Sequence, residues 1–482
     1  MTWEPVIGIE VHVELMTASK MFCGCEVAHG GQPNTRVCPT CLGLPGALPV
    51  TNRAAIESIM SIGLALGCQI SPRSVFHRKN YFYADLPKNY QISQFDVPVC
   101  HDGYLDIEVD GAARRVGIER AHMEEDTGKS IHIGLGGRIH AAERTLLDFN
   151  RSGVPLVEVV SRPDLRSAVE ARAYAQELRS VIAELGVSDV RLEEGSIRFD
   201  ANVSVRPEGS EQLGTKVEVK NMNSFRSLER AVGHEVERQT ALLESGGSVV
   251  QETRHWDEES GVTHSMRVKE GSSDYRYFTE PDLVPLVMSP EWVAGLGARL
   301  PEMPAERRAR YLSQGLAPST AGVLSGLDPG LRAVYDDAVL SGASPQAAAN
   351  WLTGEVVAWL RRSEADGPLT GLDGPNLAEL IEMVDDGAVS SSAAKELLAG
   401  IMSGEGGPRE IAERRDLLQV SDVGQLDGVI DSVLAENPDA VGEFRSGEEK
   451  VVGFLVGQIM KATGGKADPR LVNQLLREKM TG

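Results

Sequence analysis

The chain has 482 residues, which is too long for one compact core, so about two to four domains of ordinary size are expected. Its net charge of −22 argues against a broadly basic nucleic-acid-binding surface but leaves room for a local basic patch. The composition is that of a globular protein, and no long unbroken apolar stretch or basic leader segment is found, which predicts a cytoplasmic protein without a membrane span or signal peptide.

The first predicted strand covers residues 7–15, with the sequence IGIEVHVEL. Side chains alternate between the two faces of a strand. One face carries Ile7, Ile9, Val11, Val13 and Leu15, and the other carries Glu10, His12 and Glu14. Two positions apart on a strand, Glu10 and His12 lie within about 7 Å of each other. They could share a cation, and this ligand pair favours Mg²⁺ or Mn²⁺ where further oxygen ligands join it.

Four of the six cysteines lie close together, at Cys23, Cys25, Cys38 and Cys41. A reducing compartment disfavours disulfides, and two short cysteine pairs joined by a loop suit a tetrahedral Zn²⁺ bound by four thiolates. Such a site leaves no position for water, so it is structural rather than catalytic. The alternative is a set of four buried thiols that pack without a metal.

Residues 78–94, RKNYFYADLPKNYQISQ, combine aromatic and basic side chains. Tyr81, Phe82, Tyr83 and Tyr90 fall within ten positions, in a chain with only 5% aromatic residues. Aromatic rings stack on bases, and nearby lysines bind phosphate. The alternative is a loop whose aromatic side chains pack against the sheet.

Residues 122–130, HMEEDTGKS, end in a Gly-Lys-Ser that suggests a P-loop. That motif requires a glycine at position 123, which is Met123, so a P-loop is excluded. The dinucleotide-binding glycine pattern also fails, because residue 139 is isoleucine. What remains is an acidic cluster of Glu124, Glu125 and Asp126, or simply a charged turn.

Two further strands are predicted at 198–206 and 215–221, each with one apolar and one polar face. The polar faces carry Arg198, Asp200, Asn202, Lys216, Glu218 and Lys220. An ordinary antiparallel sheet with one face in water explains any one of these strands. Three such strands, rich in charged side chains, instead favour a sheet whose polar face forms the floor of a pocket.

Beyond residue 290 the apolar residues recur at spacings of three and four, which predicts helices at 305–312, 331–340, 347–362 and 377–384. We therefore expect an α+β protein. It would comprise an antiparallel-sheet catalytic cradle (1–290), a helical domain (291–405) and a small helical tail (406–482). Residues 451–482 contain five basic and two acidic residues, so the tail is locally positive.

These segments together resemble the B subunit of the tRNA-dependent amidotransferase, the GatB of the GatCAB complex. The resemblance runs from about residue 6 to residue 480. It rests on the runs GIEVHVEL, CPTCLGLPGALPV, YFYADLPKNYQISQ, HMEEDTGKS, DFNRSGVPLVEVVS, RFDANVSVR, KVEVKNMNSF, DYRYFTEPDLVP and FLVGQIMKATGGKADP.

The resemblance implies an enzyme subunit that uses ATP and Mg²⁺ to phosphorylate the side-chain carboxylate of Glu-tRNA(Gln) or Asp-tRNA(Asn). Ammonia then displaces phosphate to give the amide. The implied partners in the heterotrimer are the amidase, or GatA, which releases ammonia from glutamine, and the small GatC, together with the misacylated tRNA. This chain offers no convincing glutaminase triad of its own, since Cys68 and Cys100 both lie in apolar surroundings.

The resemblance also implies roles for individual residues. The implied Mg²⁺ ligands are Glu10, His12 and Glu125. The implied phosphate-screening cations are Lys79, Lys88 and Arg151. The implied lining of the substrate pocket or ammonia route is Tyr81, Tyr83, Asp200, Asn202, Glu218 and Lys220. The implied tRNA contacts in the tail are Lys461, Lys466 and Arg470.

The rival hypotheses are an ATP-dependent ligase or kinase of a small carboxylic acid without RNA, and a noncatalytic zinc protein that binds RNA. The positive tail and the aromatic–lysine segment argue against the first. The Glu10–His12 pair argues against the second, which has no use for a cation site on a polar sheet face.

Overall fold

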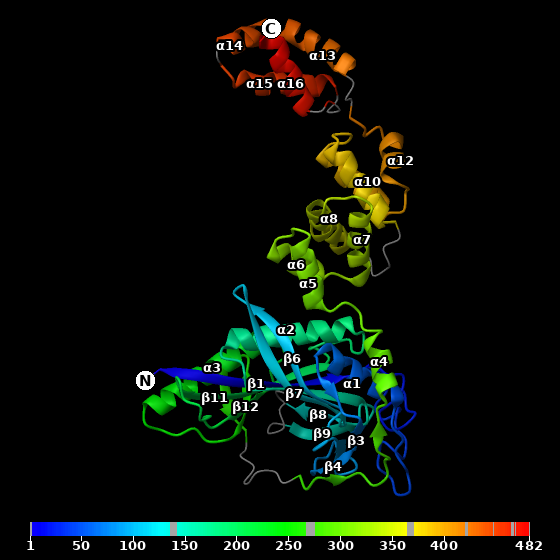
Figure 1. Ribbon diagram of the computed structural model, residues 1–482, viewed down its shortest axis with the longest axis vertical. Coiled ribbons are helices and arrows are strands. Elements are labelled where there is room, and N and C mark those ends of the chain that lie inside the picture. Colours follow the sequence, from blue (N-terminus) through cyan, green and yellow to red (C-terminus); the bar gives the residue numbers. More distant parts are fainter. Residues whose placement is uncertain are drawn as a thin grey trace. The chain divides into compact units, whose positions relative to one another are not determined.

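A computed structural model describes most of the chain, and it divides into two compact units, Met1–Ala305 and Glu306–Gly482 (Figure 1). The described residues are 2–134, 142–266, 275–363, 371–419, 423–446, 448–463, 467 and 469–481. None of the helices in these ranges combines the length and apolar character needed to cross a membrane.

The first unit is built on a nine-stranded sheet of order β14-β13-β12-β11-β1-β10-β7-β6-β2. Its strands are β1 (Trp3–Glu14), β2 (Gln69–Ile70), β6 (Cys100–Val109), β7 (Ala112–Glu125), β10 (Pro155–Ser161), β11 (Ile197–Pro207), β12 (Val217–Lys220), β13 (Thr253–Asp257) and β14 (Val262–Ser265). The pairings are antiparallel except that of β12 with β13, which is parallel. A parallel pair requires a crossover connection, and here the helix α3 (Phe225–Glu244) provides it.

The alternation predicted for residues 7–15 is confirmed, because the apolar side chains at 7, 9, 11 and 13 of β1, and Leu15 directly after it, are all at most 1% exposed. The central position of β1, between β10 and β11, explains this complete burial. The strand β11 repeats the pattern, with Ile197, Phe199, Ala201 and Val203 buried.

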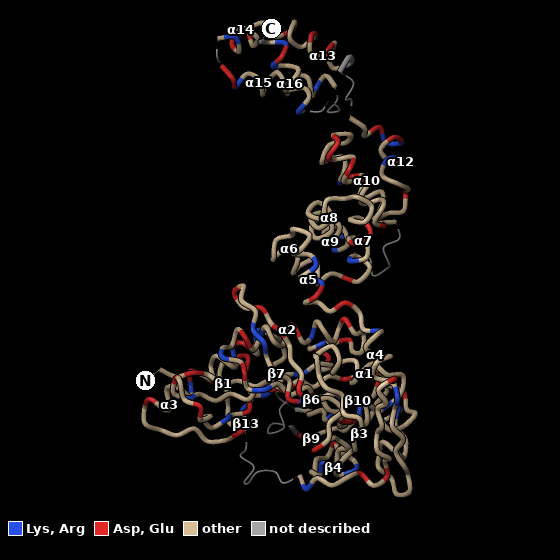
Figure 2. The backbone as a smooth tube through the Cα atoms, in the orientation of Figure 1, with Lys and Arg blue, Asp and Glu red and all other residues tan. Residues whose placement is uncertain are grey.

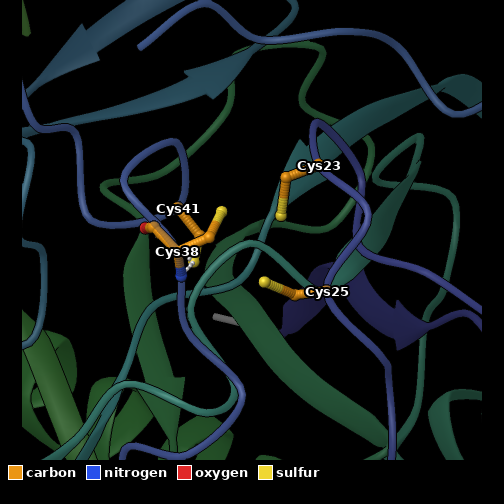
Figure 3. A group of neighbouring side chains, drawn as sticks. All are labelled: Cys23, Cys25, Cys38 and Cys41. Atoms are coloured by element: carbon orange, nitrogen blue, oxygen red, sulfur yellow. Dashed lines mark hydrogen bonds between the residues drawn. The ribbon is translucent and has the colours of Figure 1, made fainter.

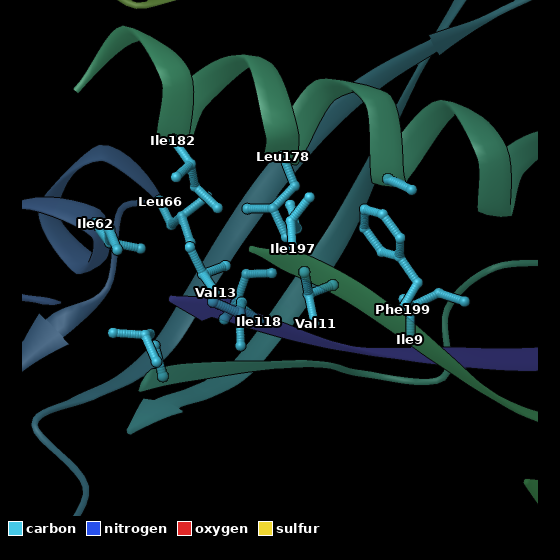
Figure 4. Close-up of a cluster of buried hydrophobic side chains, with 14 of the residues drawn as sticks. Ile9, Val11, Val13, Ile62, Leu66, Ile118, Leu178, Ile182, Ile197 and Phe199 are labelled. Carbon is cyan, nitrogen blue, oxygen red and sulfur yellow. The ribbon is translucent and has the colours of Figure 1, made fainter. Parts of the chain in front are cut away.

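Two helices cover the apolar face of the sheet. Figure 4 shows α2 (Ala168–Glu184) lying over this face, with Leu178 and Ile182 directed at Val11 and Val13. Ser167 caps α2 by accepting a hydrogen bond from the Glu170 amide, and α3 packs beside α2. A third helix, α1 (Arg53–Ala65), adds Ile62 and its neighbours to the same core. Because helices cover the apolar face, the polar side chains of the strands lie on the opposite face of the sheet.

Smaller sheets and one helix complete the first unit. They are β15 (Phe278–Thr279) with β4 (His77–Asn80) and β5 (Tyr90–Ser93), β16 (Leu286–Val287) with β3 (Arg73–Ser74), β8 (Lys129–Gly134) with β9 (Ala142–Asp148), and α4 (Pro290–Gly297). The strand β5 also contacts β7 of the main sheet, so the aromatic–lysine segment lies beside the polar face.

The second unit is helical, and with the sheet unit it confirms the predicted α+β class. Its helices are α5 (Pro304–Ser313), α6 (Pro318–Ser325), α7 (Pro329–Leu340), α8 (Pro345–Trp351), α9 (Val357–Ser363), α10 (Gly374–Asp385), α11 (Ser391–Met402), α12 (Pro408–Arg414), α13 (Val423–Glu436), α14 (Pro438–Arg445), α15 (Val451–Ala462) and α16 (Pro469–Thr481). The helix predicted at 347–362 is interrupted by a π-helical turn at Leu352–Val356.

The second unit contains two hydrophobic clusters among its described residues, one between Tyr311 and Ala412 and one between Leu426 and Met480. Residues 403–407 lie between α11 and α12. The predicted domain limits at 290 and 405 remain predictions.

Candidate active site

Polar side chains from four neighbouring strands meet on the sheet face opposite the core. In the strand register His122 of β7 lies opposite Glu158 of β10, Glu158 lies opposite His12 of β1, and His12 lies opposite Arg198 of β11. Directly opposed residues project from the same face. The four side chains therefore form one row across the sheet, and the row above it contains Glu10 and Asp200.

The two imidazoles and the Glu158 carboxylate of this row form a cluster with the carboxylate of Glu124. The Oε2 atom of Glu158 lies 3.5 Å from Nε2 of His12 and 3.4 Å from Nε2 of His122. Nε2 of His122 also lies 3.6 Å from Oε1 of Glu124. Ligand atoms of His12, Glu124 and Glu158 all lie within 4.8 Å of one another, so they could hold one metal ion.

The electrostatics of this group keep its carboxylates ionised. Burial opposes the charge of Glu158, but His122 and His12 lower its pKa to about 2. Burial likewise opposes the charge of Glu124, while the ammonium of Lys79 and the imidazole of His122 hold its pKa well below the usual range. Buried ionised carboxylates beside an imidazole are a suitable ligand set for a hard divalent cation.

Lys79 belongs to this group. Its Nζ lies 3.4 Å from Oε1 of Glu124 and 5.3 Å from the centre of the Tyr275 ring. Ser93 Oγ and Gln91 Nε2 donate to the same carboxylate at 2.9 and 3.1 Å. Burial opposes the charge of Lys79, yet the charge of Glu124 raises its pKa, so the ammonium stays protonated.

A second group lies next to the first, with three carboxylates and one ammonium. Ligand atoms of Glu10, Asp200 and Glu218 lie within 4.8 Å of one another. Lys220 Nζ lies 2.6 Å from Asp200 and 2.8 Å from Glu218, and Asn202 donates to Glu10 at 2.8 Å. Burial and the neighbouring carboxylates raise the pKa of Glu10. One lysine leaves this group with excess negative charge, which a cation would offset.

Glu125 points elsewhere. Its carboxylate pairs with Lys88 and accepts the Ile92 amide at 3.0 Å. Both charged side chains line a cavity of about 180 Å³, together with Cys23 and Cys41. The structure thus places Glu10 and His12 in two adjoining groups, and Glu125 in a third environment.

Arg151 lies in a fourth polar group, which also contains Glu14. Its guanidinium donates to the Thr127 carbonyl at 3.0 Å and lies 3.7 Å from Asp126. Arg198 lies 3.2 Å from the same Asp126 carboxylate. Burial opposes the charge of Asp126, but Arg198 and Arg151 lower its pKa to about 2, whereas burial and Asp126 raise the pKa of Glu14 to about 8.

This pair predicts a measurable pH dependence. Folded Glu14 keeps a proton that the unfolded chain releases above its ordinary pKa of 4.5. Its contribution to stability is therefore complete below pH 4.5 and is lost as pH rises through about 8, with a slope of up to about 1.4 kcal/mol per pH unit. We expect Glu14→Gln to unfold at higher denaturant than wild type at pH 8, with a smaller gain at pH 5. Equal differences at both pH values would contradict this assignment.

The aromatic segment forms a cluster of rings beside Lys79. The Tyr81 ring centre lies 5.7 Å from that of Tyr83 and 6.0 Å from that of Tyr275. Tyr81 is half-buried, whereas Phe82 is 81% exposed. The segment therefore combines a partly buried ring, Tyr81, which packs against Tyr83 and Tyr275, with an exposed ring, Phe82.

The four clustered cysteines come together as predicted, and Figure 3 shows their sulfur atoms directed toward a common centre. The four Sγ atoms lie within 4.8 Å of one another. The Cys38 amide donates to Cys41 Sγ at 3.0 Å, and the hydrogen bond from Cys23, with this amide, lowers the pKa of Cys41 to about 5. Convergent thiols of this kind fit a tetrahedral metal.

The predicted tRNA contacts lie in the last helices. Lys461 is exposed on α15, and Arg470 lies at the start of α16. Lys466 lies outside the described residues. Figure 2 shows both acidic and basic positions along α13 to α16, so any nucleic-acid contact there is confined to part of the surface.

Sequence patterns named Glu124 only as a member of the acidic cluster at 124–126, and they did not single out His122 or Glu158. Glu158 carried a signal, since it is the one charged residue in PLVEVVS, an otherwise apolar run with a single terminal serine. A charge inside such a strand is expensive unless it is paired. Its partners come from β1 and β7, and only the strand order brings them together.

Comparisons with known proteins agree with this architecture. A GatB/GatE catalytic domain model matches residues 5–294, and a GatB domain model matches residues 333–480. The aspartyl/glutamyl-tRNA(Asn/Gln) amidotransferase B subunit of Thermosynechococcus vestitus is 50% identical over 486 positions, which cover 100% of this chain and 97% of that protein. The proteins of the same name from Moorella thermoacetica and Salinispora arenicola are each 50% identical, over 482 and 483 positions, covering 100% and 99% of this chain and 100% and 96% of the relative. With matches of this extent along its whole length, the chain belongs to the family of aspartyl/glutamyl-tRNA(Asn/Gln) amidotransferase B subunits.

Proposed function

We propose that this chain is the B subunit of a glutamine-dependent amidotransferase that converts Glu-tRNA(Gln), Asp-tRNA(Asn) or both into the amide. ATP phosphorylates the side-chain carboxylate of the aminoacyl group, giving an acyl phosphate and ADP. Ammonia then attacks the acyl carbon and phosphate leaves. The observation that carries this proposal is the polar sheet face, where ionised carboxylates, imidazoles and half-buried ammonium groups lie side by side.

Two sets of residues fit a divalent cation. His12, Glu124 and Glu158 offer one imidazole and two ionised carboxylates, and Glu10, Asp200 and Glu218 offer three carboxylates. A divalent cation bound there would offset the charge of the ATP phosphates. The Mg²⁺ ligands predicted from the sequence do not lie in one group. His12 lies in the first set, Glu10 lies in the second, and Glu125 pairs with Lys88. The predicted ligand set therefore remains a prediction.

The lysines supply fixed positive charge on the same face. Transfer of a phosphoryl group is promoted mainly by positioning and by cations near the developing negative charge. Lys79 is held by Glu124 and Lys220 by Asp200 and Glu218, so each ammonium is oriented before substrate binds. Arg151 is held by two backbone carbonyls. We assign Lys79 and Lys220 to substrate phosphate and carboxylate, and for Lys88 and Arg151 the predicted role is to screen the charge of phosphate.

The cysteine cluster would hold a structural Zn²⁺. Four thiolates close the tetrahedral coordination sphere, so the metal acts as a cross-link rather than as a Lewis acid. The cluster joins the segment after β1 to the loop that leads to α1, and it also contacts Ser152 through the Cys41 carbonyl. It thereby holds the end of β1 near the cavity that contains Lys88 and Glu125.

Substitution of a cysteine in this cluster is expected to remove the metal and lower stability. Because a structural zinc site contributes directly to folding, Cys38→Ser should lose most of its bound zinc and unfold several degrees below wild type. Zinc content by elemental analysis and thermal unfolding check this. Cys68→Ser, at a buried thiol outside the cluster, is the control and should keep its zinc. Unchanged zinc content in Cys38→Ser would contradict the assignment.

The proposed reaction requires partners, because the sequence offers no convincing glutaminase triad. We propose that an amidase and a small third protein are these partners, with ammonia passing from the amidase to this chain. The test is co-expression with both partners and a transamidation assay with Glu-tRNA(Gln) and with Asp-tRNA(Asn). Amide formed on either tRNA supports the proposal. ATP-dependent turnover of free glutamate or aspartate, with no effect of tRNA, would favour the small-acid ligase, which none of the full-length relatives supports.

A further inference from the structure

Lys20 is a completely buried lysine beside the cysteine cluster. Its side chain is 0% exposed. Its Nζ donates to the carbonyl oxygens of Arg36 at 2.8 Å and Phe149 at 3.4 Å. Its own amide donates to the Cys25 carbonyl at 2.9 Å. Lys20 therefore contacts the backbone of both halves of the cysteine window, at Cys25 and two residues before Cys38.

Among the described residues, the hydrogen bonds of this ammonium go to neutral carbonyls. A fully buried charge is costly unless an opposite charge accompanies it, and two neutral carbonyls do not provide one. Within the described parts of the chain, Lys20 forms no ion pair with a carboxylate. Glu125 lies in the same region, but it is already paired with Lys88.

Two sources of negative charge lie near Lys20, the cysteine cluster and the Glu125 carboxylate, whose Oε2 would lie 3.9 Å from a β-carbon placed on Gly153. A β-carbon placed on Gly153 would lie 3.5 Å from both Cβ of Cys41 and Cδ of Lys20, so those two atoms are no more than twice that distance apart.

We propose that Lys20 is the counter-cation of the metal-bound cysteine cluster. Four thiolates around a divalent metal carry two excess negative charges. The buried ammonium offsets one of them, and its hydrogen bonds to the Arg36 and Phe149 carbonyls fix its position. In return the cluster supplies the negative charge that a buried lysine needs. This assignment rests on the zinc site proposed above, and it makes Lys20 a positioning residue rather than a catalytic residue.

Three substitutions separate the charge of Lys20 from its hydrogen bonds. Lys20→Arg keeps the charge and the donors, Lys20→Gln keeps donors without the charge, and Lys20→Met removes both. Lys395→Met makes the same change at an exposed lysine of the second unit and serves as the control. Each full-length variant, co-purified with its partner proteins, is analysed for zinc per chain and for zinc release to excess chelator.

We expect wild type, Lys20→Arg and Lys395→Met to retain about one zinc per chain and to release it slowly. A unit charge a few ångströms away in a partly buried site is worth at least about a tenfold change in affinity. Lys20→Gln and Lys20→Met should therefore release zinc at least about tenfold faster. If Lys20→Gln behaves as wild type while Lys20→Met loses zinc, the hydrogen bonds suffice and the counter-cation role is wrong. Zinc-free wild type would overturn the metal site as well, whatever the transamidation assay shows.

Discussion

His12→Ala and Glu10→Ala are each expected to reduce amide formation on misacylated tRNA by at least about 10²–10³-fold, the loss typical of removing an aligned electrostatic group from an active site. Each residue belongs to a different candidate cation group on the same sheet face. Removing either ligand leaves buried carboxylates without the cation that offsets their charge. The measurement is transamidation by the assembled complex with ATP, glutamine and each misacylated tRNA in turn.

Two controls make this result specific. Hydrolysis of glutamine by the amidase partner should remain in part, because neither residue belongs to a glutaminase site. Glu108→Ala on β6 and His264→Ala on β14 remove the same side-chain types from exposed positions of the same sheet and should retain full amidation. If His12→Ala and Glu10→Ala amidate as well as these controls, the polar face does not bind the cation.

The two faces of the central strands could be predicted from the sequence because the information is local. Side chains two positions apart on a strand must share a face, so IGIEVHVEL fixes which residues are buried with α2 and which remain for chemistry. The cysteine cluster was predictable for a related reason. Short spacings bring the two thiols of each pair close together, and the two pairs are separated by only twelve residues, so a four-thiol site is a local pattern in the sequence.

The composition of the site depends on strand order, which local patterns do not determine. Glu158 lies 146 positions from His12 in the sequence, yet β10 pairs directly with β1 and places the two residues opposite each other. The acidic run at 124–126 also shows that a local sequence pattern does not determine which residues contact one another. Its three carboxylates are adjacent in sequence, but Glu124 pairs with Lys79, Glu125 with Lys88 and Asp126 with Arg198. Neighbours at the end of a strand can thus serve different groups.

Glu158→Gln is expected to reduce amide formation by about 10²-fold or more, although the change keeps the shape of the side chain. Oε2 of Glu158 lies 3.5 Å from Nε2 of His12 and 3.4 Å from Nε2 of His122, so its ionised carboxylate lies between the two imidazoles. An amide at this position removes a negative charge from the group and presents an N–H to one of the imidazoles. Loss of a group that orients a metal-binding histidine typically costs about 10–100-fold, and loss of a ligand costs more. Transamidation is compared with Glu119→Gln, an exposed position on the adjacent β7 that should be unaffected.

A double substitution shows whether Glu158 acts together with His12. Residues that work as one unit have effects that do not add, so Glu158→Gln combined with His12→Ala should be hardly worse than His12→Ala alone. If the activity loss of the double variant equals the product of the two single losses, Glu158 contributes independently of the His12 imidazole. The assignment of His12, Glu124 and Glu158 to one cation site would then be wrong. Thermal unfolding of each variant separates these outcomes from loss of the fold. The buried carboxylate pairs with two histidines from different strands, so its removal is also expected to lower the unfolding temperature modestly.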